Sequence, residues 1–329
     1  MRQLKHTVSR WPLRKAFVIS RGSRTEAEVI QVMIMDGEHQ GFAECVPYAR
    51  YGESCDSVIA QIESVTQAIT DGASRRDIQK IMSPGAARNA IDCALWDLEA
   101  KQLGQTVGSM SGLGDPKELI SAQTISIGTE AEMAAEAQQF ARYPLLKVKL
   151  DSENIIPRIA AIHANAPASN IIIDANEAWS IAELNEHWQS LQDMAVVLIE
   201  QPLPASNDQD LIRYQGEIPI CADESCHSSA DIHALAERYQ AINIKLDKTG
   251  GLTEAINTYD AARKHQLQIM VGCMVGTSQA MAPATLLAQH AEVVDLDGPA
   301  LLAEDVAHGF QFHHGHMSPL TEQLWGGAR

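Results

Sequence analysis

Short apolar runs rich in β-branched residues recur along the chain, and each one ends at a charged residue. Five of them stand at 145–151, 171–179, 196–204, 218–225 and 241–251, and successive charged ends follow at intervals of roughly 25 residues. A strand of about 5–6 residues, a helix of about 11–12 and two short loops fill such an interval. Continuous apolar strands that alternate with helical segments indicate parallel βαβ units whose strands are buried on both faces.

Three further apolar runs continue the pattern on either side, at 121–127, 267–277 and 291–299. A helix is expected over 129–142, and the whole series gives eight strands with seven intervening helices. This α/β pattern is typical of a (β/α) barrel, in which the carboxyl ends of the strands share one mouth that carries the chemistry. We therefore expect the charged strand ends to meet at the mouth of a barrel formed by residues 116–304.

The first 115 residues have a different pattern. Strands are expected at 2–9, 15–20, 27–35 and 40–46, with a hairpin turn at Asp36-Gly37. The segment 18–28 is too polar for a core and is expected to be a loop whose flanks can pair across it. Helices are expected after Ser54 and over 85–105. We predict an α+β domain over 1–115. The tail 305–329 lacks a barrel-helix pattern and is expected to return and complete this domain.

Composition narrows the class of protein. The net charge of −17 at pH 7 argues against nucleic acid and anionic membrane surfaces as partners. The six cysteines show no Cys-x-x-Cys spacing and lie mostly in apolar runs, as expected of reduced, buried thiols. The N-terminal segment lacks the apolar core of a secretory signal, and no apolar stretch reaches about 18 residues. We expect a cytoplasmic enzyme with a small-molecule substrate, and homo-oligomerisation stays open.

Three of the charged strand ends are carboxylates: Asp174, Glu200 and Asp223. Because they follow three successive strands, we expect them side by side at the barrel mouth. Like charges at that distance repel, and a hard divalent cation would hold them together. Ligation by oxygen alone favours Mg²⁺, with Mn²⁺ as the second choice, over zinc. The alternative is three separate salt bridges, but matched positions on consecutive strands favour the metal site.

Lysines stand at the two ends of this series. Lys147 and Lys149 are two apart on one strand and therefore point to the same side, and Lys245 ends a strand about half-way round the barrel. A carbon acid held at the metal would lie between two amines on opposite faces, as a 1,1-proton transfer with inversion requires. An unperturbed lysine has a pKa of about 10.4, and we expect burial, Lys147 and the metal to lower it. The alternative is that the lysines only pair with the acids.

Five motifs carry a family resemblance: KVKLD (147–151), DANEAW (174–179), EQPLP (200–204), CADES (221–225) and IKLDKTGGL (244–252). In this order they resemble the muconate-lactonizing subgroup of the enolase superfamily, over essentially the whole chain. The resemblance implies a (β/α)7β barrel, a modified TIM barrel, with an α+β capping domain. The Mg²⁺ ligands that it implies are Asp174, Glu200 and Asp223. The acid/base pair that it implies is Lys149 and Lys245.

The same resemblance implies that the metal and Lys147 bind a substrate carboxylate and stabilise the enediolate left by loss of the α-proton. Two further residues, each close to a predicted metal ligand in the sequence, are predicted to orient the side chains of the site. Glu224 follows the third acid and is expected to orient Lys149 or Lys245, and Asn176 follows the first acid.

The substrate is indicated by residues outside this set. Asp295 and Asp297 share one face of the eighth strand, and two inward acids at the mouth favour a cation such as a substrate ammonium. This Asp-x-Asp resembles the signature of dipeptide epimerases, where it binds the α-ammonium of the N-terminal residue. Arg24, or else Arg21, is predicted to bind a distal carboxylate. RGSR (21–24), PYARYGES (47–54) and DLDGP (295–299) resemble the L-Ala-D/L-Glu epimerases of murein peptide recycling, which implies that dipeptide as substrate.

Other functions use parts of the same constellation. Muconate cycloisomerase and o-succinylbenzoate synthase would keep the catalytic set, but their substrates have no ammonium to account for Asp295 and Asp297. A Schiff-base aldolase would use Lys245 on the sixth strand and would not need three clustered carboxylates. A non-catalytic binding protein would not require lysines on both faces of a ligand.

Overall fold

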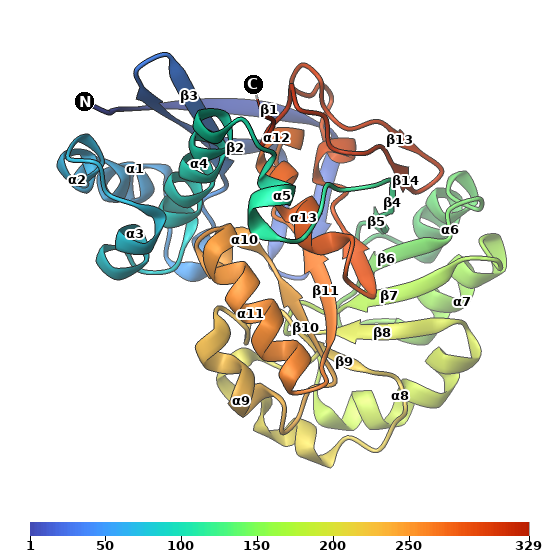
Figure 1. Ribbon diagram of the computed structural model, residues 1–329. Helices are drawn as coiled ribbons and strands as arrows, with labels where there is room; N and C mark the ends of the chain where they lie inside the picture. Colours follow the sequence, from blue (N-terminus) through green and yellow to red (C-terminus); the bar gives the residue numbers. More distant parts are fainter. Residues whose placement is uncertain (329) are drawn as a thin grey trace.

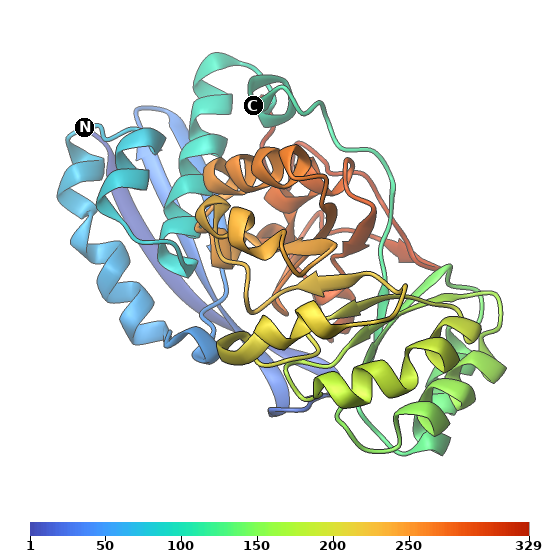
Figure 2. The same ribbon diagram turned by 90° about the horizontal axis from the view of Figure 1, so that it is seen from below.

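The computed structural model describes residues 1–328, and its central element is an eight-stranded parallel barrel (Figures 1 and 2). Its strands are β5 (Gln123–Ile125), β6 (Leu145–Lys149), β7 (Asn170–Asp174), β8 (Val196–Glu200), β9 (Ile220–Ala222), β10 (Ala241–Ile244), β11 (Gln268–Gly272) and β12 (Val293–Asp295). Each strand pairs with the next in chain order, from β5 to β12. A backbone hydrogen bond of 2.8 Å from Ala122 N to Val294 O joins the two ends of the series. The predicted barrel fold is confirmed.

Helices cover the outside of the barrel between the strands (Figure 1). They are α6 (Glu130–Gln139), α7 (Ile155–Asn165), α8 (Ile181–Asp193), α9 (Ile232–Leu235), α11 (Leu252–Lys264) and α13 (Thr285–Ala288). After β8 the expected helix is replaced by a kinked 3₁₀ segment, Ala205–Arg213. The segment is kinked at Asn207, whose backbone angles (φ −145°, ψ 37°) are not helical. The apolar strand interiors and the inner helix faces are buried together in one large core.

The N-terminal part is the predicted α+β domain. Three antiparallel strands lie in the order β1 (Gln3–Ile19), β2 (Gly22–Asp36) and β3 (His39–Cys45). Four helices follow: α1 (Cys55–Ser64), α2 (Thr66–Thr70), α3 (Arg75–Ile81) and α4 (Ala86–Leu103). Ser54 caps α1 as predicted, because its side chain accepts a hydrogen bond from Ser57 N. The longest helix, α4, packs on β3 and β2 and buries the predicted face that includes Ile91 and Leu98.

Two details predicted for this domain are wrong: the strands at 2–9 and 15–20 are one strand, and 18–28 is not a loop, although its flanks pair as expected. One continuous strand, β1, pairs with β2 through Phe17↔Arg24 and Ile19↔Gly22 around a tight turn. Pro12 lies within β1, an edge strand of its sheet where proline is tolerated, and the register with β2 shifts between Pro12 and Phe17. The polar residues of 22–28 are therefore presented on a strand.

Segments far apart in the chain meet beside the barrel. A small antiparallel sheet joins β4 (Leu119–Ile120) to β14 (His316–Met317) and β13 (Phe312–His313). The tail then reaches the N-terminal domain, where Gly326 N donates to Asp97 Oδ1 on α4 at 2.8 Å. Val107 N, in α5 (Val107–Ser111), donates to Gly326 O at 2.9 Å. We propose on these contacts that residues 1–115 and the tail from 305 form one capping unit on a 116–304 barrel.

The cap is fastened to the barrel by buried polar groups. Asp247, in α10 (Leu246–Thr249), accepts hydrogen bonds from Val46 N at 3.1 Å and from Asn89 Nδ2 at 2.8 Å. On the other side of the joint, Thr277 donates to the buried carboxylate of Glu44. Burial raises the pKa values of Asp247 and Glu44 to about 7. Within residues 1–328 no helix has both the length and the apolar character needed to cross a membrane.

Candidate active site

The three predicted metal ligands come together at the carboxyl ends of the barrel strands. Asp174 ends β7, Glu200 ends β8 and Asp223 follows β9. All three are at least 98% buried, and one oxygen of each lies within 4.8 Å of the others. The strand register accounts for this, since Asp174 is paired directly with Glu200.

Each carboxylate has one oxygen held by a donor of the protein framework. Asp174 Oδ1 accepts from the backbone N of Asn176 at 3.0 Å. Glu200 Oε1 accepts from Asn243 Nδ2 at 2.6 Å, and Asp223 Oδ1 accepts from Lys248 Nζ at 2.6 Å. Three acids are therefore fixed so that their second oxygens face one another.

Lysine ammonium groups contact those second oxygens. Lys149 Nζ lies 2.5 Å from Asp174 Oδ2, and Lys245 Nζ lies 2.7 Å from Asp223 Oδ2. Lys147 Nζ lies 2.5 Å from Glu200 Oε2 and 3.2 Å from Asp174 Oδ2. Three positive charges thus stand against the oxygen atoms that a divalent cation would bind.

These charges set the protonation of the site. Burial would lower the pKa of Lys147 and of Lys245, but the carboxylates around them raise both well above the ordinary value. The expected lowering of the pKa of Lys245 is therefore absent here, because Asp223 and Glu200 outweigh burial and Lys147. Burial and the charge of Asp174 raise the pKa of Glu200 to about 7.

The acid cluster fits a hard divalent cation. Its three free-facing oxygens are carboxylate oxygens on a fixed frame, which is the ligand type that Mg²⁺ prefers. A cation bound to the three acids would replace the ammonium groups that now contact them. Those of Lys147, Lys149 and Lys245 could then contact a substrate. The lysine on β6 and the lysine after β10 stand four strands apart in a barrel of eight, and therefore on opposite sides.

The Asp-x-Asp pair lies at the same mouth. Asp295 ends β12, and its Oδ2 lies 2.7 Å from Lys147 Nζ. Its Oδ1 is buried and has no hydrogen-bond partner among residues 1–328. Asp297 Oδ2 accepts from Thr124 N at 2.7 Å, and burial next to Asp295 raises the pKa of Asp297 to about 7. A buried, partly unpartnered acid pair is suited to bind a cationic group.

The two candidate arginines have different surroundings. Arg21 is engaged with the barrel, where its Nη2 lies 2.7 Å from Glu224 and its Nη1 donates to Asn176 O at 3.0 Å. The guanidinium of Arg24 instead lies 4.9 Å from the centre of the Tyr48 ring. Arg21, Arg24 and Tyr48 all line a cavity of about 320 Å³ under the β1–β2 turn. Arg24 is therefore the arginine with donors to offer a ligand.

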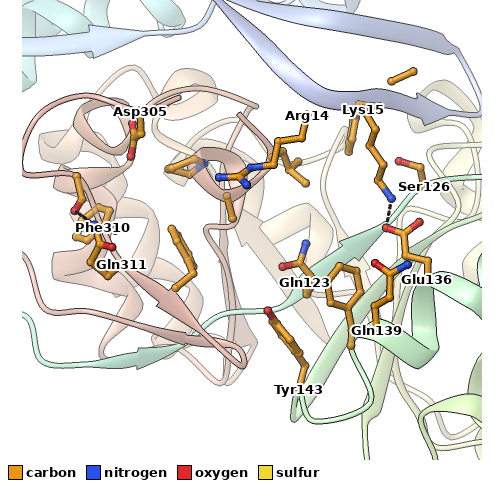
Figure 3. A pocket seen from close by; sticks show the side chains of 18 of the residues that line it. Arg14, Lys15, Gln123, Ser126, Glu136, Gln139, Tyr143, Asp305, Phe310 and Gln311 are labelled. Atoms are coloured by element: carbon orange, nitrogen blue, oxygen red, sulfur yellow. Dashed lines mark hydrogen bonds and ion pairs between the residues drawn. The ribbon is translucent and has the colours of Figure 1, made fainter. Parts of the chain in front are cut away.

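A second cavity, about 640 Å³, lies away from these groups, between β1, β5, α6 and the tail (Figure 3). Lys15 and Glu136 form an ion pair at one end of it, and Gln123 and Tyr143 lie toward its middle. Its lining contains none of the clustered acids and neither lysine of the proposed acid/base pair. This cavity is therefore not the site of the barrel chemistry.

Comparison with known proteins agrees with the fold. Residues 1–113 match the model of the mandelate racemase/muconate lactonizing enzyme N-terminal domain, and residues 130–323 match the enolase C-terminal domain-like model. The chain belongs to the enolase superfamily. Within this superfamily it falls in the mandelate racemase/muconate lactonizing enzyme group.

Individual members of the superfamily are similar to this chain over nearly its whole length. The L-Ala-D/L-Glu epimerase of Escherichia coli is 46% identical over 96% of this chain and 99% of its own length. An N-acetyl-D-glutamate racemase of a Pseudoalteromonas species is 48% identical over 91% and 96%, respectively. An enolase family member from Agrobacterium tumefaciens with homology to dipeptide epimerases is 46% identical, with a TM-score of 0.97. Its structure contains sodium and L-Ala-L-Glu, and the match covers 99% of this chain and 100% of that one.

A more distant member of the superfamily has a structure that contains Mg. The dipeptide epimerase of Cytophaga hutchinsonii, complexed with Mg and D-Ala-L-Val, is 26% identical with a TM-score of 0.90. The match covers 99% of this chain and 94% of that chain.

One residue of this enolase superfamily site has contacts other than those expected, and two had no predicted role. Glu224 was expected to orient a catalytic lysine, but its carboxylate binds Arg21 at 2.7 Å and lies 3.5 Å from Asn176 Nδ2. It therefore joins the cap to the barrel. Lys248 and Asn243 were given no role, although both lie in or beside the quoted motif IKLDKTGGL. The available signal was a second lysine three residues after Lys245, and its direction could not be read from a loop.

Proposed function

We propose that this protein is an L-Ala-D/L-Glu epimerase, an isomerase that inverts the α-carbon of the C-terminal residue of the dipeptide. The observation that carries the proposal is the placement of Lys149 and Lys245 on opposite sides of one carboxylate cluster, with Asp295 and Asp297 at the same mouth. The name of the Escherichia coli relative and the L-Ala-L-Glu bound by the Agrobacterium tumefaciens protein support the same substrate.

Binding uses three separate groups of this chain. The α-carboxylate of the glutamate lies against Lys147, and the ammonium of the alanine lies against Asp295 and Asp297. The side-chain carboxylate of the glutamate is bound by Arg24, because Arg21 is already engaged with Glu224. Asp174, Glu200 and Asp223 would hold Mg²⁺, which would supply positive charge beside the α-carboxylate as the α-proton leaves.

Proton transfer is carried out by the two lysines. One of them, as a neutral amine, takes the α-proton from its face of the substrate and becomes an ammonium. The other, as an ammonium, gives a proton to the same carbon from the opposite face and becomes neutral. The carbon is inverted, no atom is gained or lost overall, and the two lysines have exchanged protonation states. Phe17, whose ring centre lies 5.8 Å from Lys149 Nζ, helps to exclude water on one side.

The test is incubation of L-Ala-L-Glu with enzyme and Mg²⁺ in D₂O, followed by proton NMR and chiral chromatography. We expect L-Ala-D-Glu to form with one deuterium at the glutamate α-carbon and none at the alanine. Formation of neither the epimer nor the deuterated dipeptide would rule the proposal out. Borohydride treatment in the presence of the substrate should trap no adduct on Lys245, in contrast to a Schiff-base aldolase.

Racemisation of an N-acylated glutamate is the second candidate, because the Pseudoalteromonas relative is an N-acetyl-D-glutamate racemase. The structure favours a free amine. Asp295 Oδ1 is buried without a partner among residues 1–328, and an ammonium offers three donors where an acetamide offers one. The deciding measurement is kcat/KM for L-Ala-L-Glu against N-acetyl-L-glutamate on the same enzyme preparation. A higher value for N-acetyl-L-glutamate would move the assignment to the second candidate.

The variant Asp297→Asn tests whether the site binds a free substrate amine. We expect this variant to lose activity on dipeptides with a free amine, because an ammonium beside Asp297 would favour the ionised carboxylate, a form that asparagine cannot adopt. Equal rates of wild type and variant on L-Ala-L-Glu would remove that role from Asp297. A cytoplasmic place in the recycling of murein peptides is part of the proposal and is supported by the substrate alone.

A further inference from the structure

The ammonium of Lys248 differs from those of the other lysines at the barrel mouth. Lys248 is 98% buried, and its Nζ donates to Asp223 Oδ1 and to Asp223 O, both at 2.6 Å, and to Asn243 O at 3.0 Å. These three bonds use all three N–H donors of an ammonium. Lys248 therefore has no donor left for a substrate, and its contacts fix Asp223 from behind.

Asn243 restrains Glu200 in the same way. Its side-chain Nδ2 donates to Glu200 Oε1 at 2.6 Å, and Asn243 is fully buried in β10. The neighbouring strand leaves room for this amide because residue 272 is glycine. A Cβ at Gly272 would stand 2.7 Å from Asn243 Oδ1 and 2.8 Å from Asn243 Nδ2. Gly272 therefore leaves the space in which the amide reaches Glu200, and the hydrogen bond to Glu200 Oε1 holds it there.

Mg²⁺ and Ca²⁺ differ in coordination number, in ligand distance and in how they bind a carboxylate. Mg²⁺ demands six ligands in a tight octahedron at about 2.0–2.1 Å, whereas Ca²⁺ takes 6–8 oxygens at about 2.3–2.6 Å and often binds both oxygens of one carboxylate. At this site Lys248 occupies one oxygen of Asp223, and Asn243 occupies one oxygen of Glu200. Binding of an ion to both oxygens of Asp223 or Glu200 would compete with these hydrogen bonds, so each acid favours binding through its other oxygen.

We propose that Lys248 and Asn243 are positioning residues that set the metal selectivity of the site, by limiting Asp223 and Glu200 to one oxygen each and thereby favouring Mg²⁺ over Ca²⁺. The inference rests on the metal site of the proposed function. It concerns binding of the ion alone and can be measured without any substrate.

The experiment is calorimetric titration of the chelator-treated protein with MgCl₂ and, separately, with CaCl₂, on wild type and on Lys248→Met. We expect the Mg²⁺ affinity of the variant to fall by about 10- to 100-fold, the usual effect of losing a group that supports a metal ligand. The Ca²⁺ affinity should stay unchanged or rise, because Asp223 Oδ1 becomes available to the larger ion. The ratio of the two dissociation constants is the decisive quantity.

Two further variants make the result interpretable. Asn243→Ala frees Glu200 Oε1 and should change the ratio in the same direction, including in the case that Lys248→Met does not fold. Lys101→Met removes an ammonium 2.8 Å from the buried Asp97 in the cap, outside the site, and should leave both affinities as in wild type. Circular dichroism and thermal melting check that each variant is folded.

The outcomes separate this inference from the proposed function. Equal losses for Mg²⁺ and Ca²⁺, or an unchanged ratio, in both Lys248→Met and Asn243→Ala would overturn the selectivity role and leave the epimerase proposal standing. Wild type that binds neither ion would instead contradict the metal site on which the proposed function depends.

Discussion

Lys149 and Asp174 are directly paired residues of neighbouring barrel strands, and Lys149 Nζ lies 2.5 Å from Asp174 Oδ2. One member of this pair is the proposed base, and the other is the proposed metal ligand. A second lysine–acid contact of this kind joins Lys245 to Asp223, just beyond the ends of β10 and β9, where Lys245 Nζ lies 2.7 Å from Asp223 Oδ2. Binding of a cation by the acids and release of an amine toward the substrate are therefore coupled events in this site.

Replacement of one lysine at a time tests the division of labour between the two faces. Lys149→Ala or Lys245→Ala should lower the rate of epimerisation by about 10²- to 10⁴-fold, the usual contribution of a positioned acid or base. In D₂O each variant should still exchange the α-proton of one epimer, which its remaining lysine faces. Proton NMR of separate L-Ala-L-Glu and L-Ala-D-Glu samples measures this. Exchange of both epimers by a single variant would contradict one lysine per face.

Removal of one carboxylate charge tests the metal site. Glu200→Gln should keep the hydrogen bond from Asn243, and hence the fold, but weaken Mg²⁺ binding by about 10- to 100-fold because a neutral amide is a poorer ligand. Calorimetry gives the affinity and circular dichroism gives the fold. The matched control is Glu292→Gln, an acid paired with Arg263 on the barrel exterior, which should bind Mg²⁺ as wild type does. Wild-type affinity in Glu200→Gln would remove this acid from the ligand set.

The two arginines of the β1–β2 turn should behave differently. Arg24→Met is expected to lower kcat/KM for L-Ala-L-Glu by roughly 10- to 100-fold, the value of one hydrogen bond between charged groups, and to have little effect on an uncharged dipeptide such as L-Ala-L-Val. Arg21→Met should affect both dipeptides alike, because Arg21 joins the turn to Glu224. Kinetics on both dipeptides give the ratio for each variant. A selective loss in Arg21→Met would exchange the two roles.

The joint between cap and barrel should be sensitive to pH. Burial raises the folded-state pKa values of Asp247 and Glu44 to about 7, above the ordinary values of carboxylic acids. The native state then binds more protons than the unfolded state between about pH 4 and pH 7, so the free energy of unfolding falls as the pH rises through this range. Melting temperatures of the metal-free protein should fall accordingly.

Asp247→Asn is the control for this pH dependence. It keeps the oxygen that accepts from Val46 N and Asn89 Nδ2, but it cannot ionise. Its melting temperature should depend less steeply on pH than that of wild type. Identical slopes in the two proteins would show that Asp247 does not titrate in this range.

The sequence was most informative where the regular repetition of βαβ units placed a residue at the end of a strand. Lys149, Asp174 and Glu200 end their strands, so their meeting follows from the topology once the strands are recognised. It was uninformative where an interaction depends on side-chain direction in irregular segments. Lys248 turns back from α10 onto Asp223, and only the three-dimensional path of that turn shows it.

Local polarity was misleading in the cap. The residues of 22–28 read as a loop because they are polar, yet they pair along β1 at the edge of a small sheet with one exposed face. Polarity also could not distinguish Arg21 from Arg24, which lie three residues apart in the same segment. Their roles separate only through partners supplied by distant segments, Glu224 for Arg21 and the Tyr48 ring for Arg24.

The ammonium groups at the barrel mouth also bear on how this protein folds. Many small metal-binding domains fold only when their ion arrives, since nothing else offsets the repulsion among their ligands. Here Lys147, Lys149 and Lys245 supply the opposing charge from within the chain. The repulsion among the three acids is therefore offset within the chain itself, and we expect the metal-free protein to reach this fold.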